Sequence, residues 1–140
     1  MLILLVEDEV LVRRLASRAL RSAGFEVLEA GAGDQALELL RERDDEITAI
    51  VSDVIMPGMT GPEFVRTAIE GGLGERPVLY ISAFLSHPAS APVELPEGAP
   101  FLRKPFTSSQ LVQKLRELLE GAGLSLPNRG KLLSFPGGNQ

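Results

Sequence analysis

Short apolar runs alternate with amphipathic stretches along most of this chain. Residues 2–6 are apolar at every position, residues 78–81 are almost so, and a further apolar run that includes Ile50 and Val51 ends abruptly on Asp53. Runs of this length, apolar on both faces, are typical of buried parallel strands. Residues 25–30 alternate between apolar and polar, which favours a strand nearer the sheet edge, and residues 99–102 predict a short fifth strand.

Between these runs the apolar period becomes that of a helix. The first predicted helix begins at Val10 and ends before Gly24, and further helices are predicted at 34–43, at 62–71 and after Thr107, a capping residue. We expect the first helix to face the core with one apolar stripe, made of Val10, Leu11, Leu15, Ala19, Leu20 and Ala23.

The pattern breaks where an α/β unit would place its fourth helix. Pro88, Pro92 and Pro96 are spaced four residues apart there. Each proline removes a backbone donor and costs about 3 kcal/mol in a helix interior. This fourth helix is therefore predicted to be shortened to one turn or irregular.

The predicted order is βαβαβαβ(α)βα. Right-handed crossovers make this an α/β fold with a doubly wound, five-stranded parallel sheet and helices on both faces. Residues 1–121 form this domain. Residues 122–140 are rich in Gly and contain no acid, so we interpret them as a C-terminal extension, either disordered or docked through Leu132, Leu133 and Phe135.

Composition removes several classes of function. The 140 residues fit one domain, and the net charge of −5 argues against direct binding of nucleic acid or anionic membranes. The chain has no Cys, which excludes disulfides, thiol catalysis and thiolate metal sites. No apolar run approaches the roughly 20 residues of a membrane span, and the apolar start is too short for a signal peptide, so a cytoplasmic location is expected.

Polar residues follow four of the predicted strands: Glu7 and Asp8, then Asp53, Ser82 and Lys104. These ends lie on one edge of a parallel sheet, and they become neighbours if the strand order is 2-1-3-4-5. Clustered carboxylates repel one another, and oxygen ligands without His or Cys favour Mg²⁺. A carboxylate can form an aspartyl phosphate, with metal and lysine neutralising the transferring group.

Four motifs carry a resemblance to a known family. They are Leu5-Val-Glu-Asp-Glu9, Ser52-Asp-Val-Ile-Met-Pro-Gly58, Ile81-Ser-Ala83 and Leu102-Arg-Lys-Pro-Phe106. Over residues 2–120 the chain resembles the receiver domain of response regulators in bacterial two-component signalling, including the receivers of hybrid histidine kinases. The resemblance implies a flavodoxin-like fold of strand order 2-1-3-4-5 and a signalling phosphoacceptor, not an enzyme.

The resemblance implies the following roles. Asp53 accepts phosphate from a histidine kinase or a histidine phosphotransfer protein. Asp8 and Asp53 bind Mg²⁺ directly, the Ile55 carbonyl is a further ligand, and Glu7 assists through water. A homodimer is compatible with this family.

The switch residues are carried over in the same way. Lys104 pairs with Asp53 at rest and with the phosphoryl group afterwards. Ser82 moves toward the phosphoryl oxygens, and Phe101, which stands where Tyr is commoner, follows it. A cis peptide is expected before Pro105. Ile55 and Phe84 stand at the positions that line the path of the hydrolytic water, and because both are apolar in this chain, slow dephosphorylation is expected.

Other interpretations remain at this point. The three acids from Glu7 to Glu9 could cap a helix, and Asp53 could begin an Asx turn. The segment Gly31-Ala-Gly-Asp-Gln-Ala36 fits a dinucleotide-binding fingerprint. A receiver-like scaffold could also bind partners without phosphorylation.

Overall fold

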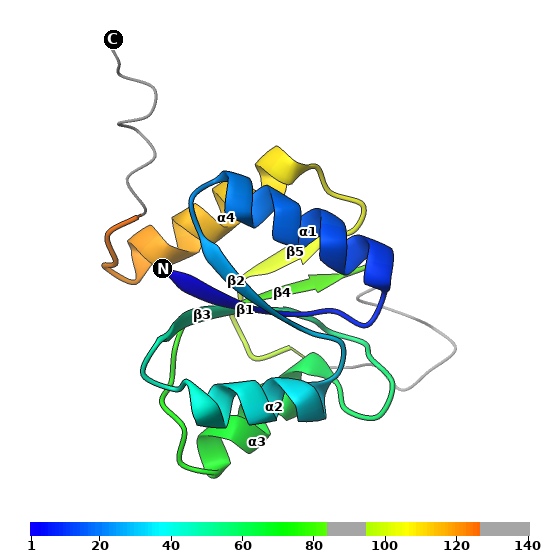
Figure 1. The fold of residues 1–140 in the computed structure, drawn as a ribbon, viewed down its shortest axis with the longest axis vertical. Helices are drawn as coiled ribbons and strands as arrows, with labels where there is room; N and C mark the ends of the chain where they lie inside the picture. Colours follow the sequence, from blue (N-terminus) through cyan, green and yellow to red (C-terminus); the bar gives the residue numbers. More distant parts are fainter. Residues whose placement is uncertain (84–94, 127–140) are drawn as a thin grey trace, which may run out of the picture.

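The structure is a computed structural model that describes residues 1–83 and 95–126. The predictions for Phe84, for a short or irregular helix around Pro88 and Pro92, and for docking of the tail through Leu132, Leu133 and Phe135 lie outside these ranges. Within them, the predicted alternation of strands and helices is confirmed (Figure 1). The elements are β1 (Leu2–Val6), α1 (Val10–Ser22), β2 (Glu26–Ala30), α2 (Gly33–Glu42), β3 (Ile47–Asp53), α3 (Gly61–Glu70), β4 (Val78–Ser82), β5 (Phe101–Arg103) and α4 (Ser108–Gly121).

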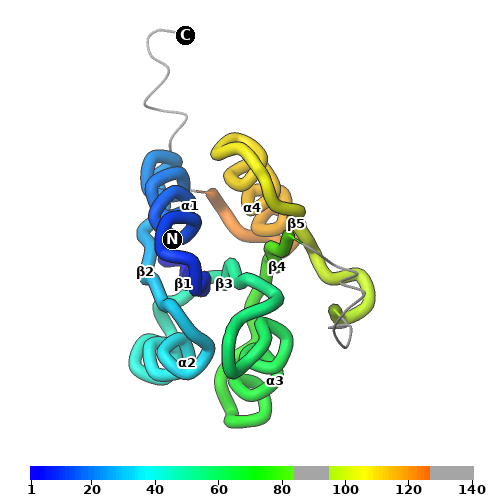
Figure 2. Tube along the Cα trace, turned by 90° about the vertical axis from the view of Figure 1, so that its right-hand side faces the viewer, coloured from blue at the N-terminus to red at the C-terminus, as the bar shows by residue number. Residues whose placement is uncertain are grey.

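The five strands form one parallel sheet in the order β2-β1-β3-β4-β5. The fold class and the strand order expected from the sequence are therefore confirmed. Helices α1 and α4 cover one face of the sheet, and α2 and α3 cover the other (Figures 1 and 2). The described residues between β4 and β5, residue 83 and residues 95–100, contain no helix.

Two apolar cores lie on the two faces of the sheet. In β1, which is buried at all five positions, Ile3 and Leu5 contact the core beneath α1 and α4, whereas Leu2, Leu4 and Val6 contact the core above α2 and α3. This is the two-sided burial that the continuous apolar run predicts. Leu124 and Leu126, beyond the end of α4, pack against the first core.

The expectation for the apolar stripe of α1 is wrong in its first half. Val10, Leu11 and Leu15 are 51%, 70% and 57% exposed. At 3.6 residues per turn, Leu11 and the fully buried Leu20 lie on opposite sides of the helix, so only one of them can face the sheet. The apolar residues cover more of α1 than the core can bury, and the buried stripe is made of Ala16, Ala19, Leu20 and Ala23.

Side-chain caps fix the starts of α3 and α4. The Thr60 hydroxyl accepts from the Glu63 amide, and the Glu63 carboxylate accepts from the Thr60 amide. Thr107 and Gln110 make the same reciprocal pair at the start of α4, which confirms Thr107 as its cap. These capping boxes fix the directions of the two helices just after the loops that follow β3 and β5.

Among the residues that the structure describes, no helix has the length and apolar character needed to cross a membrane.

Candidate functional site

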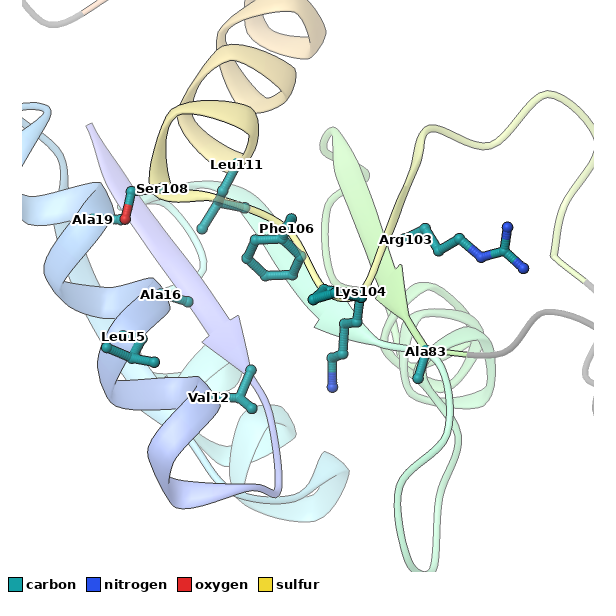
Figure 3. Close-up of a pocket in the computed structure, with 11 residues that line it drawn as sticks. Val12, Leu15, Ala16, Ala19, Ala83, Arg103, Lys104, Phe106, Ser108 and Leu111 are labelled. Atoms are coloured by element: carbon teal, nitrogen blue, oxygen red, sulfur yellow. The ribbon is translucent and has the colours of Figure 1, made fainter.

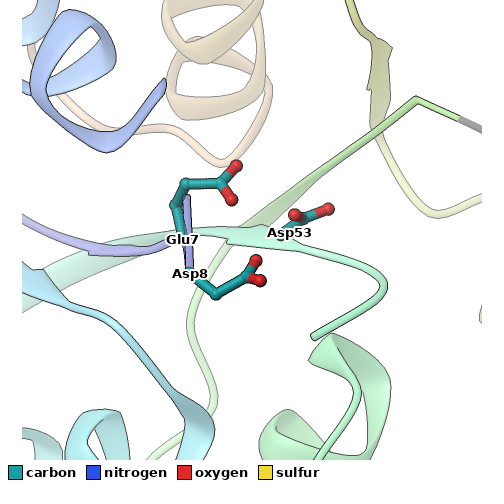
Figure 4. Close-up of side chains that lie close together, drawn as sticks. All are labelled: Glu7, Asp8 and Asp53. Carbon is teal, nitrogen blue, oxygen red and sulfur yellow. The ribbon is translucent and has the colours of Figure 1, made fainter. Parts of the chain in front are cut away.

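The polar residues that follow the strands converge at the carboxyl edge of the sheet. Glu7 and Asp8 extend from the end of β1 toward Asp53, the last residue of β3 (Figure 4). One carboxylate oxygen from each of the three residues lies within 4.8 Å of the other two. Parallel strand order therefore brings together acids that are 45 residues apart in the chain.

Lys104 holds this acidic cluster together. Its Nζ lies 2.7 Å from Glu7 Oε1, 3.1 Å from Asp53 Oδ2 and 3.4 Å from Glu9 Oε1. The Lys104 side chain is 12% exposed, so its ion pairs with Glu7 and Asp53 form with little access to water. Lys104 donates its backbone N–H to the Ser82 carbonyl at 2.9 Å, and the peptide bond before Pro105 is cis, as expected.

Glu9 belongs to this cluster although the sequence alone did not place it there. Its side chain is 63% exposed and reaches Lys104 from the outside. Its backbone N–H donates to Glu7 Oε2 at 3.0 Å, and as the N-cap of α1 its side chain makes no capping hydrogen bond. Although Glu9 stands at the N-cap position, the interpretation of these acids as a capping side chain with first-turn acids is wrong, because Glu9 makes no capping bond and the first turn of α1 contains no acid.

Burial sets the electrostatics of the site. Glu7 is fully buried, and burial raises its pKa above the ordinary value, although the contact with Lys104 and the Glu9 amide oppose this. The pKa of Asp8 is also raised, first by burial and then by the hydrogen bond and charge of Glu7. Burial alone would lower the pKa of Lys104, but its contacts with Glu7 and Asp53 together raise it.

The donor set fits a hard divalent cation. Oxygens that share one Mg²⁺ lie about 3 Å apart when adjacent and about 4 Å apart when opposite, given Mg–O distances near 2.1 Å. A separation of up to 4.8 Å between the carboxylate oxygens allows two of them to bind directly and the third through a water molecule. Burial destabilises the charged forms of Glu7 and Asp8 and so raises their pKa values, and a bound cation would stabilise these charged forms.

Gly61 and Ser52 fix the backbone that presents Asp53. The Ser52 hydroxyl donates to the Asp53 carbonyl at 2.9 Å, and the Gly61 amide donates to the Val54 carbonyl at 2.9 Å. A Cβ atom on Gly61 would lie well inside 3.0 Å of the Asp53 carbonyl oxygen. The first turn of α3 can therefore approach the end of β3 this closely only without a side chain at residue 61.

The remaining predicted residues lie in or just after β3, β4 and β5. Ser82, at the end of β4, is 2% exposed, and Ile55, two residues after Asp53, is 44% exposed. Phe101 is half-buried in β5 and aligned with Tyr80 of β4. The structure thus places Ser82 at the same sheet edge as the acids and Phe101 farther from it, at the start of β5.

The glycine-rich segment after β2 has a packing role. A Cβ atom on Gly33 would lie 2.9 Å from the Met59 sulfur, and one on Gly31 would lie 3.1 Å from the Arg13 guanidinium. Side chains of the protein therefore occupy the space that a dinucleotide pyrophosphate would need beside these glycines. This packing does not favour the dinucleotide-binding interpretation.

An apolar cleft of about 730 Å³ borders the acidic cluster. Figure 3 shows Val12, Leu15 and Ala16 of α1 on one side of it, with Phe106 and Leu111 opposite. Lys104 also lines the cleft, at the end where the acids lie. The exposed Leu11 and Leu15 extend this apolar surface over α1.

The known proteins that this chain resembles are described as receiver domains or as proteins of two-component signalling that contain one. The family model for the response regulator receiver domain matches residues 3–116. The sensor kinase CckA of Brucella abortus is 36% identical over 118 residues, which are 84% of this chain but only 12% of that protein. The response regulator receiver protein CpdR of the same organism is 32% identical over 86% of this chain and 98% of its own length.

Solved structures show the same relationship. The receiver domain of the hybrid histidine kinase CckA has a TM-score of 0.71 and 39% identity, covering 85% of this chain and 99% of that one. The chemotaxis protein CheY4 of Vibrio cholerae has a TM-score of 0.69 and 30% identity, covering 84% of this chain and 98% of its own. The similarity therefore covers the whole of a receiver domain, both in a large sensor kinase and in proteins of this size.

Proposed function

The chain belongs to the response regulator receiver domain family, and from this premise we propose that it is a phosphoacceptor that takes a phosphoryl group on Asp53. The observation that carries the proposal is the contact of Lys104 with the Asp53 carboxylate at 3.1 Å, beside two further carboxylates. A scaffold without phosphorylation would not need these buried charges in one cluster.

The transfer requires little covalent chemistry from the protein. An Asp53 carboxylate oxygen forms a bond to phosphorus while the bond from phosphorus to the donor's imidazole nitrogen breaks. The imidazole keeps that electron pair and takes up a proton. Asp8, Asp53 and the Ile55 carbonyl would hold Mg²⁺, with Glu7 assisting through water, and the ion would supply positive charge that neutralises the phosphoryl oxygens.

Lys104 and Ser82 act on the product. Lys104 already contacts Asp53, so its ammonium group needs only a short movement to pair with a phosphoryl oxygen. The Ser82 hydroxyl, at the neighbouring strand end, donates to another oxygen, and Phe101 follows into the space that Ser82 leaves. The added charge thereby shifts a two-state equilibrium of the surface formed by β4 and β5.

The partner is a histidine kinase or a histidine phosphotransfer protein, and its docking surface is the apolar face beside the site. Leu15 lines the cleft together with Lys104, and Val10 and Leu11 are further exposed apolar residues of the same helix. Exposed apolar patches of this kind mark interaction sites. A protein docked there would have its phosphohistidine near Asp53, and the transfer is proposed to take place in the cytoplasm.

Dephosphorylation is proposed to be slow. Ile55 lies two residues after the acceptor, is 44% exposed, and has no polar group to orient a water molecule for attack on the acyl phosphate. Phe84, the second apolar residue in the proposal, lies outside the described residues. The phosphorylated state should therefore outlast the encounter with the donor.

The proposal is tested by incubating the protein with acetyl phosphate and Mg²⁺ and measuring its intact mass. One phosphoryl adduct is expected for the wild type and for Asp45→Asn, a control at an exposed aspartate in the loop before β3. No adduct is expected for Asp53→Asn or without Mg²⁺. An unmodified wild type would favour the scaffold, and an adduct that persists in Asp53→Asn would contradict the assignment of the acceptor.

A further inference from the structure

Arg13 connects the loop that carries the acids to the edge of the sheet. Arg13 lies in the first turn of α1 and donates from Nη1 to the Glu7 backbone carbonyl at 2.7 Å. Its Nε lies 3.5 Å from Glu29 Oε1 on β2. Its side chain is only 20% exposed, which differs from the outward position that a helical arginine usually takes.

The second carboxylate oxygen of Glu29 is also paired with an arginine. Arg21, two turns farther along α1, lies with Nη2 3.6 Å from Glu29 Oε2 and donates to the Val27 carbonyl at 3.0 Å. Glu29 therefore lies between two arginines of α1, and the three side chains tie the helix to β2. Figures 1 and 2 both show α1 beside β2. The contact with Glu29 thus orients the Arg13 guanidinium group toward the Glu7 carbonyl.

Both backbone polar groups of Glu7 are paired. Its N–H donates to the Ala30 carbonyl at 3.0 Å, and its carbonyl accepts from Arg13. Glu7 is fully buried in the intact protein, and removal of Arg13 would take away the partner of its carbonyl. The room for this contact comes from Gly31, where a Cβ atom would lie 3.1 Å from Nη1.

We propose that Arg13 is a positioning residue for the Mg²⁺ site, which holds the backbone between Glu7 and Asp8 so that their carboxylates face Asp53. This inference rests on the proposed function, since it assumes that the acidic cluster binds the metal. Arg13 makes none of the contacts that Lys104 makes with the carboxylates, so it acts through the backbone of the β1–α1 loop.

Charge and positioning predict opposite results for the loss of Arg13. Removing a positive charge near the site would strengthen Mg²⁺ binding if only the electric field mattered. Losing the backbone anchor would weaken binding, and the loss of such outer contacts typically costs about 10-fold to 100-fold in metal affinity. The direction of the change in the dissociation constant therefore separates the two effects.

The experiment is a calorimetric Mg²⁺ titration of the wild type, Arg13→Met, Arg13→Lys and Arg14→Met. Arg14 is the neighbouring exposed arginine on the same helix turn and measures the effect of charge alone. Arg13→Met should weaken binding about 10-fold or more. Arg13→Lys, which keeps the charge but cannot reach Glu7 and Glu29 together, should fall between the wild type and Arg13→Met, and Arg14→Met should bind as tightly as the wild type or more tightly.

Amide hydrogen exchange gives a second readout without metal. Arg13→Met should lose protection at Glu7 and Glu9 while the amides of β3 keep theirs. If Arg13→Met does not fold, the comparison of Arg13→Lys with Arg14→Met still decides the matter. Unchanged or tighter Mg²⁺ binding in both Arg13 variants would overturn the positioning role and leave the proposed function intact. A wild type that binds no Mg²⁺ would overturn both.

Discussion

Replacing Gly61 by Ala should destabilise the protein through one contact at the functional edge of the sheet. The added Cβ would lie well inside 3.0 Å of the Asp53 carbonyl oxygen and 3.0 Å from the Ser52 hydroxyl. The first obstacle is backbone at the end of a central strand, so it cannot rotate away as a side chain would. Either α3 moves outward or the Asp53 peptide shifts.

The expected cost lies at the upper end of the overpacking range, about 3 kcal/mol. For a domain of this size about 4 °C of melting temperature corresponds to each kcal/mol, so a decrease of about 12 °C is expected. Gly33→Ala is the matched control, because Gly33 is also the first residue of a helix and gains the same helix propensity. The added Cβ there would lie 2.9 Å from the Met59 sulfur and 3.1 Å from the Met59 Cβ, and because these are side-chain atoms rather than backbone, a smaller loss of about 1 kcal/mol is expected.

Urea denaturation of both variants at fixed Mg²⁺ concentration measures the difference in the free energy of unfolding. Phosphorylation by acetyl phosphate, measured below the melting temperature of each variant, shows whether the Asp53 backbone has also moved. Gly61→Ala should be slower than Gly33→Ala. Equal stability of the two variants would refute the reasoning, because it would mean that the approach of α3 to β3 does not require a glycine.

Three further predictions concern the charges and the apolar residue of the site. Lys104→Met leaves the buried carboxylates without the lysine ammonium group, so it should lower the free energy of unfolding by about 2 kcal/mol in the absence of Mg²⁺ and should tighten Mg²⁺ binding. Denaturation with and without the metal measures both effects, and a variant as stable as the wild type would contradict the prediction. The half-life of the wild-type phosphoprotein, followed by mass spectrometry, should be minutes or longer, and Ile55→Asn should shorten it; a half-life of seconds would refute slow hydrolysis. Protons compete with Mg²⁺ for Glu7 and Asp8, whose pKa values are raised above 4.5 and 3.8 respectively. As the pH decreases, calorimetry should therefore show that the Mg²⁺ affinity begins to fall while the pH is still above 4.5. An affinity that falls only below pH 3.8 would be inconsistent with burial of the acids.

The sheet and the position of the acids could be predicted from the sequence because they depend on short-range patterns. The fully apolar run of β1 predicts burial on both faces, and an acid directly after a buried parallel strand must lie at its carboxyl end. The strand order came from resemblance to a family, since the apolar pattern alone does not fix which strands are neighbours. The contact between Lys104 and Asp53, 51 residues apart, follows only once that order is known.

The side of α1 that faces the core could not be predicted from its apolar pattern. Val10, Leu11 and Leu15 are apolar for reasons other than burial in this domain, and the proposed docking surface accounts for their exposure. The role of Arg13 was also beyond the sequence. Four arginines of α1 look alike in the helical pattern, and only the structure shows that Arg13 turns toward the Glu7 carbonyl.

The central claim is that one edge of the sheet holds a magnesium-assisted phosphoryl acceptor on Asp53. A crystal structure with Mg²⁺ and beryllofluoride, a mimic of the phosphoryl group, tests it most directly. The account predicts the metal between Asp8 and Asp53, the mimic on the Asp53 carboxylate, and Lys104 in contact with a fluorine atom. A metal held without Asp53, or a mimic on another carboxylate with Lys104 still paired to Glu7 alone, would contradict it.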